Sequence, residues 1–133
     1  MPATRTVRAA GRFSRPIVAA IDLSKIFGVR AGAKSDHRFT GVWPIVVNGR
    51  VFARSWTQSA KGWYRTLLED PQSVIQVGER EVRARGIPLR GERIKDAIDE
   101  AYAEKYPTKA SQKYVRGFRT PRRRDATIEF VPR

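Results

Sequence analysis

The chain has 133 residues, the length of one ordinary domain, and carries 27 Lys and Arg against 13 Asp and Glu, a net charge of +14. It has no cysteine and one histidine, His37. These counts exclude disulfides, thiolate nucleophiles, Cys-based zinc or iron–sulfur sites and His-rich metal sites. No apolar run approaches the roughly 20 residues that cross a bilayer or the apolar stretch of a secretory signal. A cytoplasmic location is therefore expected, with an organellar transit peptide in the arginine-rich, acid-free residues 1–20 as the alternative.

The positive charge lies at the two ends of the chain. Residues 1–40 carry eight Lys and Arg and two acids, residues 41–104 ten and nine, and residues 105–133 nine and two, so the charges are +6, +1 and +7. Basic ends favour polyanions of any kind, including phosphate-bearing cofactors and nucleic acids. A dedicated nucleic-acid domain more often spreads its basic residues over the folded face, so the pattern allows nucleic acid without favouring it.

The first predicted elements are an arm, a helix and a loop. Residues 1–16 are small and basic and contain Pro2, Gly11 and Pro16, which is typical of a flexible arm before a single domain over 17–133. Residues 17–28 are predicted as a short helix that ends at Gly28, the residue type preferred after a helix C-terminus. Residues 29–41 are polar and are predicted as a loop.

The clearest local signal is a β-hairpin. Two β-rich runs, 42–47 and 51–56, are joined by Asn48-Gly49. Asn-Gly is the preferred pair of a type I′ turn because both central residues need a positive φ. Pro44 has no N–H to donate to a neighbouring strand, so its end of the first strand is predicted at a sheet edge or bulge.

The rest of the chain alternates helices and strands. The sequence predicts a helix over 61–69, whose apolar stripe comprises Trp63, Tyr64, Leu67 and Leu68. A hairpin of strands 73–77 and 81–87 and a helix over 92–106 follow. Residues 108–124 are basic and predicted as irregular, and residues 126–131 are predicted as the last strand. Short antiparallel strands with helices at their ends indicate the α+β class. Five strands suffice for a small barrel.

Three segments resemble known families. KGWYRTLLEDP over 61–71 lies between a hairpin and the run Val82-Arg83-Ala84-Arg85. It resembles the W-Y-x-N-L-x-x-x-P segment of the deazaflavin-dependent nitroreductases, a branch of the FMN-binding split-barrel proteins that also include pyridoxamine-phosphate oxidases. IDEAYAEKY over 98–106 and ATIEFVPR over 126–133 resemble an uncharacterised bacterial family grouped with the split barrels. The resemblance covers roughly residues 17–133, and one departure is Thr66, where the nitroreductases have Asn.

The resemblance implies a small antiparallel split β-barrel with short flanking helices that forms a homodimer, with a flavin in a cleft at the interface. It further implies an oxidoreductase that uses FMN or a deazaflavin coenzyme to reduce a small organic acceptor. Two alternatives stay open. In the first, the barrel is a module without redox activity, which either binds a ligand or is free of any cofactor. In the second, the basic ends bind nucleic acid or another polyanion.

Cofactor contacts are expected around the end of the first hairpin and the start of the helix that follows. Arg54, Ser55, Ser59 and Lys61 supply cations, hydroxyls and helix-terminal N–H groups suited to a phosphate, and in the resemblance this segment makes the phosphate contacts. Trp63 could border the flavin ring. The structural alternative is that Arg54 and Lys61 are solvated and that Trp63 is a core residue.

Three other groups of polar residues are candidate functional sites. His37 is either a proton donor or an exposed loop residue. Asp99 and Glu100 are adjacent on a helix and point apart, which speaks against an acid–base pair. The strongest basic cluster is either a polyanion site or a solvated loop; it comprises Lys109, Lys113, Arg116, Arg119, Arg122, Arg123 and Arg124.

Overall fold

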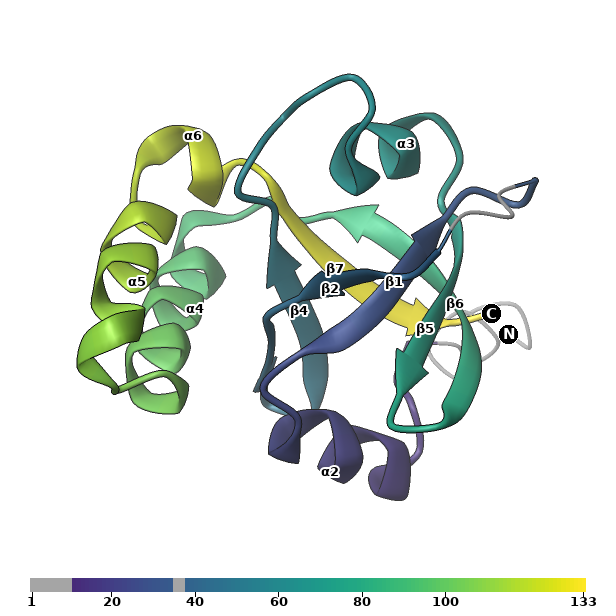
Figure 1. Ribbon diagram of the computed structural model, residues 1–133, viewed down its shortest axis with the longest axis horizontal. Helices are drawn as coiled ribbons and strands as arrows, with labels where there is room; N and C mark the ends of the chain where they lie inside the picture. Colours follow the sequence, from purple (N-terminus) through teal and green to yellow (C-terminus); the bar gives the residue numbers. More distant parts are fainter. Residues whose placement is uncertain (1–10, 35–37) are drawn as a thin grey trace, which may run out of the picture.

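The computed structural model describes residues 11–34 and 38–133, so His37 and residues 1–10 of the predicted arm lie outside the described residues. Its centre is one antiparallel sheet in the order β2-β1-β5-β6-β7-β4-β3 (Figure 1). The strands are β1 (Phe27–Ala31), β2 (Thr40–Val42), β3 (Pro44–Val47), β4 (Arg50–Arg54), β5 (Gln72–Val77), β6 (Arg80–Pro88) and β7 (Thr127–Pro132). The two edge strands, β2 and β3, are separated in the chain by Trp43 alone, so the sheet curls into a nearly closed barrel. The split-barrel α+β class is confirmed.

The predicted hairpin forms as expected. Strands β3 and β4 pair with Val47 opposite Arg50, and the turn residues Asn48 and Gly49 have φ values of 52° and 75°. Both values lie in the left-handed region that a type I′ turn needs. Pro44 lies in the edge strand β3, where the missing N–H leaves no strand partner unsatisfied.

The prediction for residues 17–41 is wrong in its boundaries. Helix α2 spans Arg15–Leu23 and ends before Gly28, which lies in β1. A Cβ on Gly28 would lie 2.8 Å from the Cβ of Phe39, so the glycine allows a close approach of two chain segments and does not end a helix. The predicted loop over 29–41 contains the rest of β1 and the start of β2, which brings the strands to seven.

The part of the predicted arm that the structure describes packs against the barrel. Phe13 is 8% exposed and belongs to the barrel core. Arg12 Nη1 donates to the carbonyl oxygen of Asn48 at 2.8 Å. Pro16 lies in the first turn of α2, where its missing N–H costs no helical hydrogen bond.

Helices cover the barrel on three sides (Figure 1). Helix α3 (Trp63–Glu69) lies at one end and contacts β1 and β6, and α2 lies at the other end against β3. Helices α4 (Glu92–Lys105), α5 (Gln112–Phe118) and α6 (Pro121–Arg124) form a layer on one side. The prediction that residues 108–124 are irregular is therefore wrong. Val115 and Phe118 are buried against α4, and this packing stabilises a helix too short to form alone.

The core has two parts, and the two faces of β4 contribute to one part each. Val51 and Ala53 point into the barrel, whereas Phe52 points under the helical layer with Ile98 and Tyr102 of α4. This alternation is expected of a β-strand, because successive side chains point to opposite faces of the sheet. In the predicted stripe of α3, Tyr64 and Leu67 are buried, Trp63 is half-buried and Leu68 is exposed.

Lys105, at the end of α4, gives the fold a specific pH dependence. Its Nζ donates to the carbonyl oxygens of Pro44 at 2.8 Å and Ile21 at 3.2 Å. Burial lowers the Lys105 pKa to about 8 from the usual 10.5, against the opposing charge of Asp22. Between these values the unfolded chain binds a proton that the folded chain has lost, so this group adds stability as the pH rises.

We expect the urea midpoint of the wild type to rise from about pH 8 to about pH 10 and to fall at higher pH. The fall arises because burial raises the pKa of the Tyr102 and Tyr106 hydroxyls above the usual 10, so the unfolded chain ionises first. In Lys105→Met the rise should be smaller than in the wild type. Equal rises in the two proteins would show that Lys105 does not cause the effect.

Candidate cofactor cleft and the buried arginine network

An aromatic cleft of about 570 Å³ lies where β2, the loop after β4, the start of α3 and helix α5 meet. Its walls carry five large aromatic side chains: Trp43, Trp56, Trp63, Tyr114 and Phe118. Small-molecule sites commonly have this size and this mainly apolar lining with a few polar groups. The polar groups here come chiefly from the segment between Arg54 and Lys61.

The aromatic walls are held by their neighbours. Trp43 stacks on Tyr106, with ring centroids 4.3 Å apart and an interplanar angle of 9°. Trp56 meets Tyr114 edge-on at 5.3 Å. Trp63 lies tilted over Phe130, a buried residue of β7, at 6.1 Å. Because each ring rests on another aromatic side chain, the walls are preformed.

A second cleft of about 600 Å³ adjoins the first and shares Thr40, Lys61 and Trp63 with it. Four cationic side chains line this basic cleft: Arg30, Lys34, Arg38 and Lys61. Two acids, Glu69 and Asp70, lie there as well. The Asp70 carboxylate accepts hydrogen bonds from the backbone N–H groups of Ala33 and Gln72, which hold its pKa below the usual value. Its negative charge is therefore partly compensated by these N–H groups. The basic cleft therefore suits an anionic group.

The segment between β4 and α3 carries the other predicted cofactor contacts. Ser55 is buried, its N–H donates to Ala126 O at 3.0 Å, and its hydroxyl donates to Thr57 O. Ser59 and Lys61 are exposed, and the Lys61 N–H donates to Ser59 Oγ at 3.4 Å. Trp63 is half-buried, and it packs on the core with one side and lines the aromatic cleft with another. Lys61 and Trp63 thus lie together at the junction of the two clefts.

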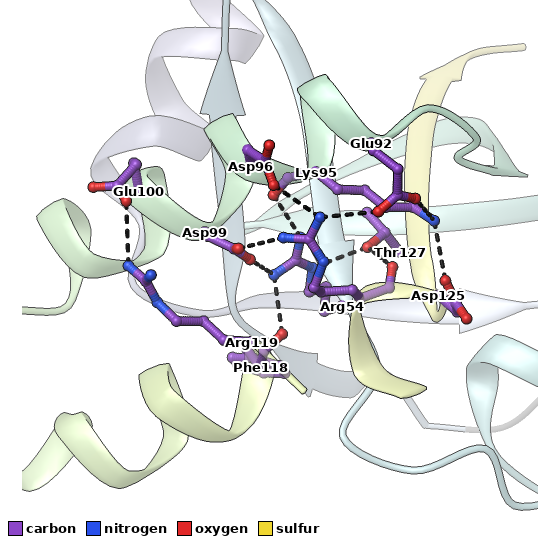
Figure 2. A network of polar contacts seen from close by, with 11 residues as sticks. Arg54, Glu92, Lys95, Asp96, Asp99, Glu100, Phe118, Arg119, Asp125 and Thr127 are labelled. Carbon is purple, nitrogen blue, oxygen red and sulfur yellow. Dashed lines mark hydrogen bonds and ion pairs between the residues drawn. The ribbon is translucent and has the colours of Figure 1, made fainter. Parts of the chain in front are cut away.

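Arg54 occupies a different place from its neighbours in sequence. Its side chain is 0% exposed and is surrounded by acceptors from α4, α5 and β7 (Figure 2). Nε donates to Thr127 Oγ1 at 2.9 Å, Nη2 donates to Lys95 O at 2.9 Å, and Nη1 donates to Phe118 O at 3.0 Å and to Asp99 Oδ1. Burial lowers the pKa of the Arg54 guanidinium, and the hydrogen bond and charge of Asp99 oppose this. Arg54 also lines the aromatic cleft, but these bonds engage its guanidinium with groups of the protein.

Asp99 connects Arg54 to a second arginine. Its Oδ2 accepts from Arg124 Nη1, and Arg124 Nη2 reaches Asp96 at 2.9 Å and Glu92 at 3.1 Å. Lys95 in turn reaches Asp125 at 3.2 Å. The network joins β4 to the helical layer, and Asp99 serves in it as an ion-pair partner.

The C-terminal basic cluster is partly used within the fold. Arg124 is bound by three carboxylates, Arg119 pairs with Glu100 at 3.4 Å, and Arg123 donates to Trp56 O at 2.9 Å. Lys109, Lys113, Arg116 and Arg122 are exposed. In the described part of the chain, no group of three or more His, Asp or Glu residues is placed to hold a metal ion. No helix among residues 11–34 and 38–133 is long and apolar enough to cross a membrane.

Several solved structures share this fold. A candidate pyridoxamine 5'-phosphate oxidase from Listeria innocua matches with a TM-score of 0.57 and 10% identity over 87% of this chain and 88% of that one. An F420-H2-dependent reductase matches with a TM-score of 0.55 and 18% identity over 80% and 93%. A domain-swapped dimer matches with a TM-score of 0.54 and 18% identity over 97% and 95%. At these identities the likeness concerns the fold.

The chain is also similar in sequence to one protein family. A comparison with curated proteins finds no match to this chain. The profile of a family described as an uncharacterized protein conserved in bacteria (DUF2255) matches residues 18–130, which include strands β1 to β6, most of β7 and the residues that line both clefts. The chain therefore belongs to this bacterial family.

Proposed function

We propose that the chain binds FMN or a deazaflavin coenzyme across the two clefts and reduces a small organic acceptor. The observation that carries this proposal is the junction at Lys61 and Trp63, where a cleft with aromatic walls meets a cleft with cationic walls. A flavin has the same two parts, a planar ring system and an anionic tail. The fold neighbours that are named for F420-H2 and for pyridoxamine phosphate chemistry support the proposal by analogy.

The aromatic cleft fits the ring. Its volume of about 570 Å³ is sufficient for a drug-sized ligand, and its preformed walls offer stacking surfaces on Trp43, Trp56 and Trp63. Backbone N–H and hydroxyl groups of the segment after Arg54 lie beside these rings. Such groups could orient the polar edge of the ring system.

The basic cleft fits the tail. Of the four cationic residues of this cleft, Lys61 is the one that also lines the aromatic cleft, and it is exposed with no ion-pair partner among the described residues. Arg30 is less available, since its guanidinium lies 4.6 Å from the Phe39 ring centroid and 3.7 Å from Glu81. Lys61 is therefore the residue that we expect to bind the phosphate nearest the ring.

A bound flavin or deazaflavin would supply hydride transfer, which is chemistry of the cofactor itself. The residues of this chain would bind the tail, hold the ring against the aromatic wall and keep water from one of its faces. The exposed aromatic residues Trp56 (42%) and Tyr114 (39%) at the cleft would then be covered by ligand, acceptor or a second copy. A homodimer is part of the proposal, and the domain-swapped neighbour supports it by analogy.

Lys61→Ala should weaken FMN binding by roughly 10- to 150-fold, the equivalent of about 1.5–3 kcal/mol for a hydrogen bond to a charged group. Riboflavin has the same ring and no phosphate, so its affinity should change little. Fluorescence titration of both ligands measures the difference. Arg65→Ala is the control, because Arg65 is an exposed residue of α3 outside both clefts. Equal losses for FMN and riboflavin would remove Lys61 from the phosphate site.

A further inference from the structure

Trp56 forms a wall of the aromatic cleft, and residues outside the cleft hold it in position. Its side chain lines the cleft beside Tyr114 and Phe118, although the residue is 42% exposed. Two further residues contact the indole without lining the cleft: Gly117 in α5 and Arg123 in α6. Both belong to the C-terminal helical layer, and neither lines the cleft, so they contact Trp56 from outside the ligand space.

Gly117 is a glycine because of Trp56. A Cβ at this position would lie 2.3 Å from Cη2 and 2.6 Å from Cζ3 of the indole, closer than atoms can approach without a shift. Gly117 lies inside α5, where alanine is the better helix former. Its φ is not in the left-handed region, so backbone conformation does not require a glycine. The close approach of the indole remains as the reason.

Arg123 holds the indole by a second contact. Its Cζ lies 3.6 Å from the Trp56 ring centroid, and its Nε donates to the carbonyl oxygen of Trp56 at 2.9 Å. A guanidinium stacked on an indole is the favoured geometry of a cation–π contact. One side chain therefore binds both the backbone and the ring of Trp56. An exposed aromatic residue with two such contacts is restricted to few orientations.

We propose that Gly117 and Arg123 are positioning residues, which hold Trp56 in place as a wall of the ring site. This inference rests on the proposed flavin site and assigns the placement of one of its walls to two residues outside the cleft. A methyl group at position 117 would push the indole toward the ligand space. The phosphate contacts around Lys61 would stay in place.

The test is a titration of wild type and Gly117→Ala with FMN and with riboflavin. Gly117→Ala should weaken both affinities about tenfold or more, and by the same factor, because the ring contact is lost and the phosphate contact is kept. Lys61→Ala should instead weaken FMN alone. Arg116→Ala, an exposed neighbour in α5 outside the clefts, should leave both affinities unchanged.

A second variant separates positioning from a general loss of structure. Trp56→Leu removes the ring that the added methyl group would meet, so Gly117→Ala should have no further effect on either affinity in that background. An effect of Gly117→Ala that persists without Trp56, that concerns FMN alone, or that is absent in the wild-type background would overturn the inference while leaving the flavin site standing. If the wild type binds neither ligand, the proposed function fails, and the inference falls with it.

Discussion

Asp99→Ala should lower the free energy of unfolding by about 3–5 kcal/mol, the cost of removing one partner from a buried ion pair. The loss is large because Arg54 is 0% exposed and would keep its charge without a counter-ion. Arg124, the other partner of Asp99, would keep Glu92 and Asp96. Urea unfolding followed by tryptophan fluorescence measures the change as a shift of midpoint at constant slope.

Asp96→Ala is the matched control on the same helix. Asp96 also binds Arg124, at 2.9 Å, but its side chain is 72% exposed, so its loss should cost less than about 1 kcal/mol. Asp99→Asn keeps an acceptor oxygen and removes the charge, and its effect should lie between the two. A loss for Asp99→Ala as small as that for Asp96→Ala would show that the network does not depend on the buried pair.

Tyr102→Phe should lower the free energy of unfolding by about 2–4 kcal/mol, although only one oxygen atom is removed. The Tyr102 hydroxyl accepts from the Arg54 N–H at 2.9 Å and donates to Trp43 O at 2.8 Å. The residue is fully buried, so both backbone groups would lose their partner with no water to replace it, at about 1–3 kcal/mol each. The ring and its packing stay.

Tyr64→Phe provides the comparison for this prediction. The Tyr64 hydroxyl donates one hydrogen bond, to Asp125 O at 3.1 Å, and this bond is only partly buried although the ring is in the core. Its removal should cost about 0.5–1.5 kcal/mol. Equal losses in the two variants would mean that the hydroxyl of Tyr102 does not join β4 to the segment between β2 and β3.

Signals that are local in sequence predicted much of the fold. The Asn48-Gly49 turn predicted the β3–β4 hairpin, and the helical pattern over 92–106 predicted α4. Each of these patterns reports a preference of the backbone or of one buried face. The split-barrel resemblance assembled them into the right architecture.

The errors arose where distant contacts decided the structure. Gly28 is suited to a helix C-terminus, but its role is to let Phe39 approach β1. The segment 108–124 has a weak helical pattern, and α5 forms because Val115 and Phe118 pack on α4. Neither contact is visible in a local window of sequence.

Arg54 shows the same limit for the candidate site. Its position after the hairpin predicted a phosphate contact, which stays a prediction, and the structure adds an ion pair with Asp99, 45 residues further along the chain. A signal was present in α4, since Lys95 and Asp99 share the apolar stripe of Ile98 and Tyr102. Charged residues on a buried stripe predict internal partners. Pairing them with Arg54 required the fold.

The network also supports the cleft. Arg54 Nη1 donates to the carbonyl oxygen of Phe118, which lines the aromatic cleft and follows Gly117 in the chain. Arg54 thus holds α5 against the barrel beside the aromatic cleft that it lines, and Lys61 and Trp63 are the predicted residues that line both clefts. Ser55, buried and bound to Thr57, shapes the segment between them.

The most direct test of the flavin site is a titration of the purified protein with FMN, and in parallel with a deazaflavin coenzyme. Flavin absorbance and tryptophan fluorescence are followed together, because three tryptophans line the cleft. The proposal predicts saturable, micromolar binding of at least one of the two cofactors, with quenching of the tryptophan emission. A folded protein that binds neither would contradict it, and the aromatic cleft would then serve a role without a flavin.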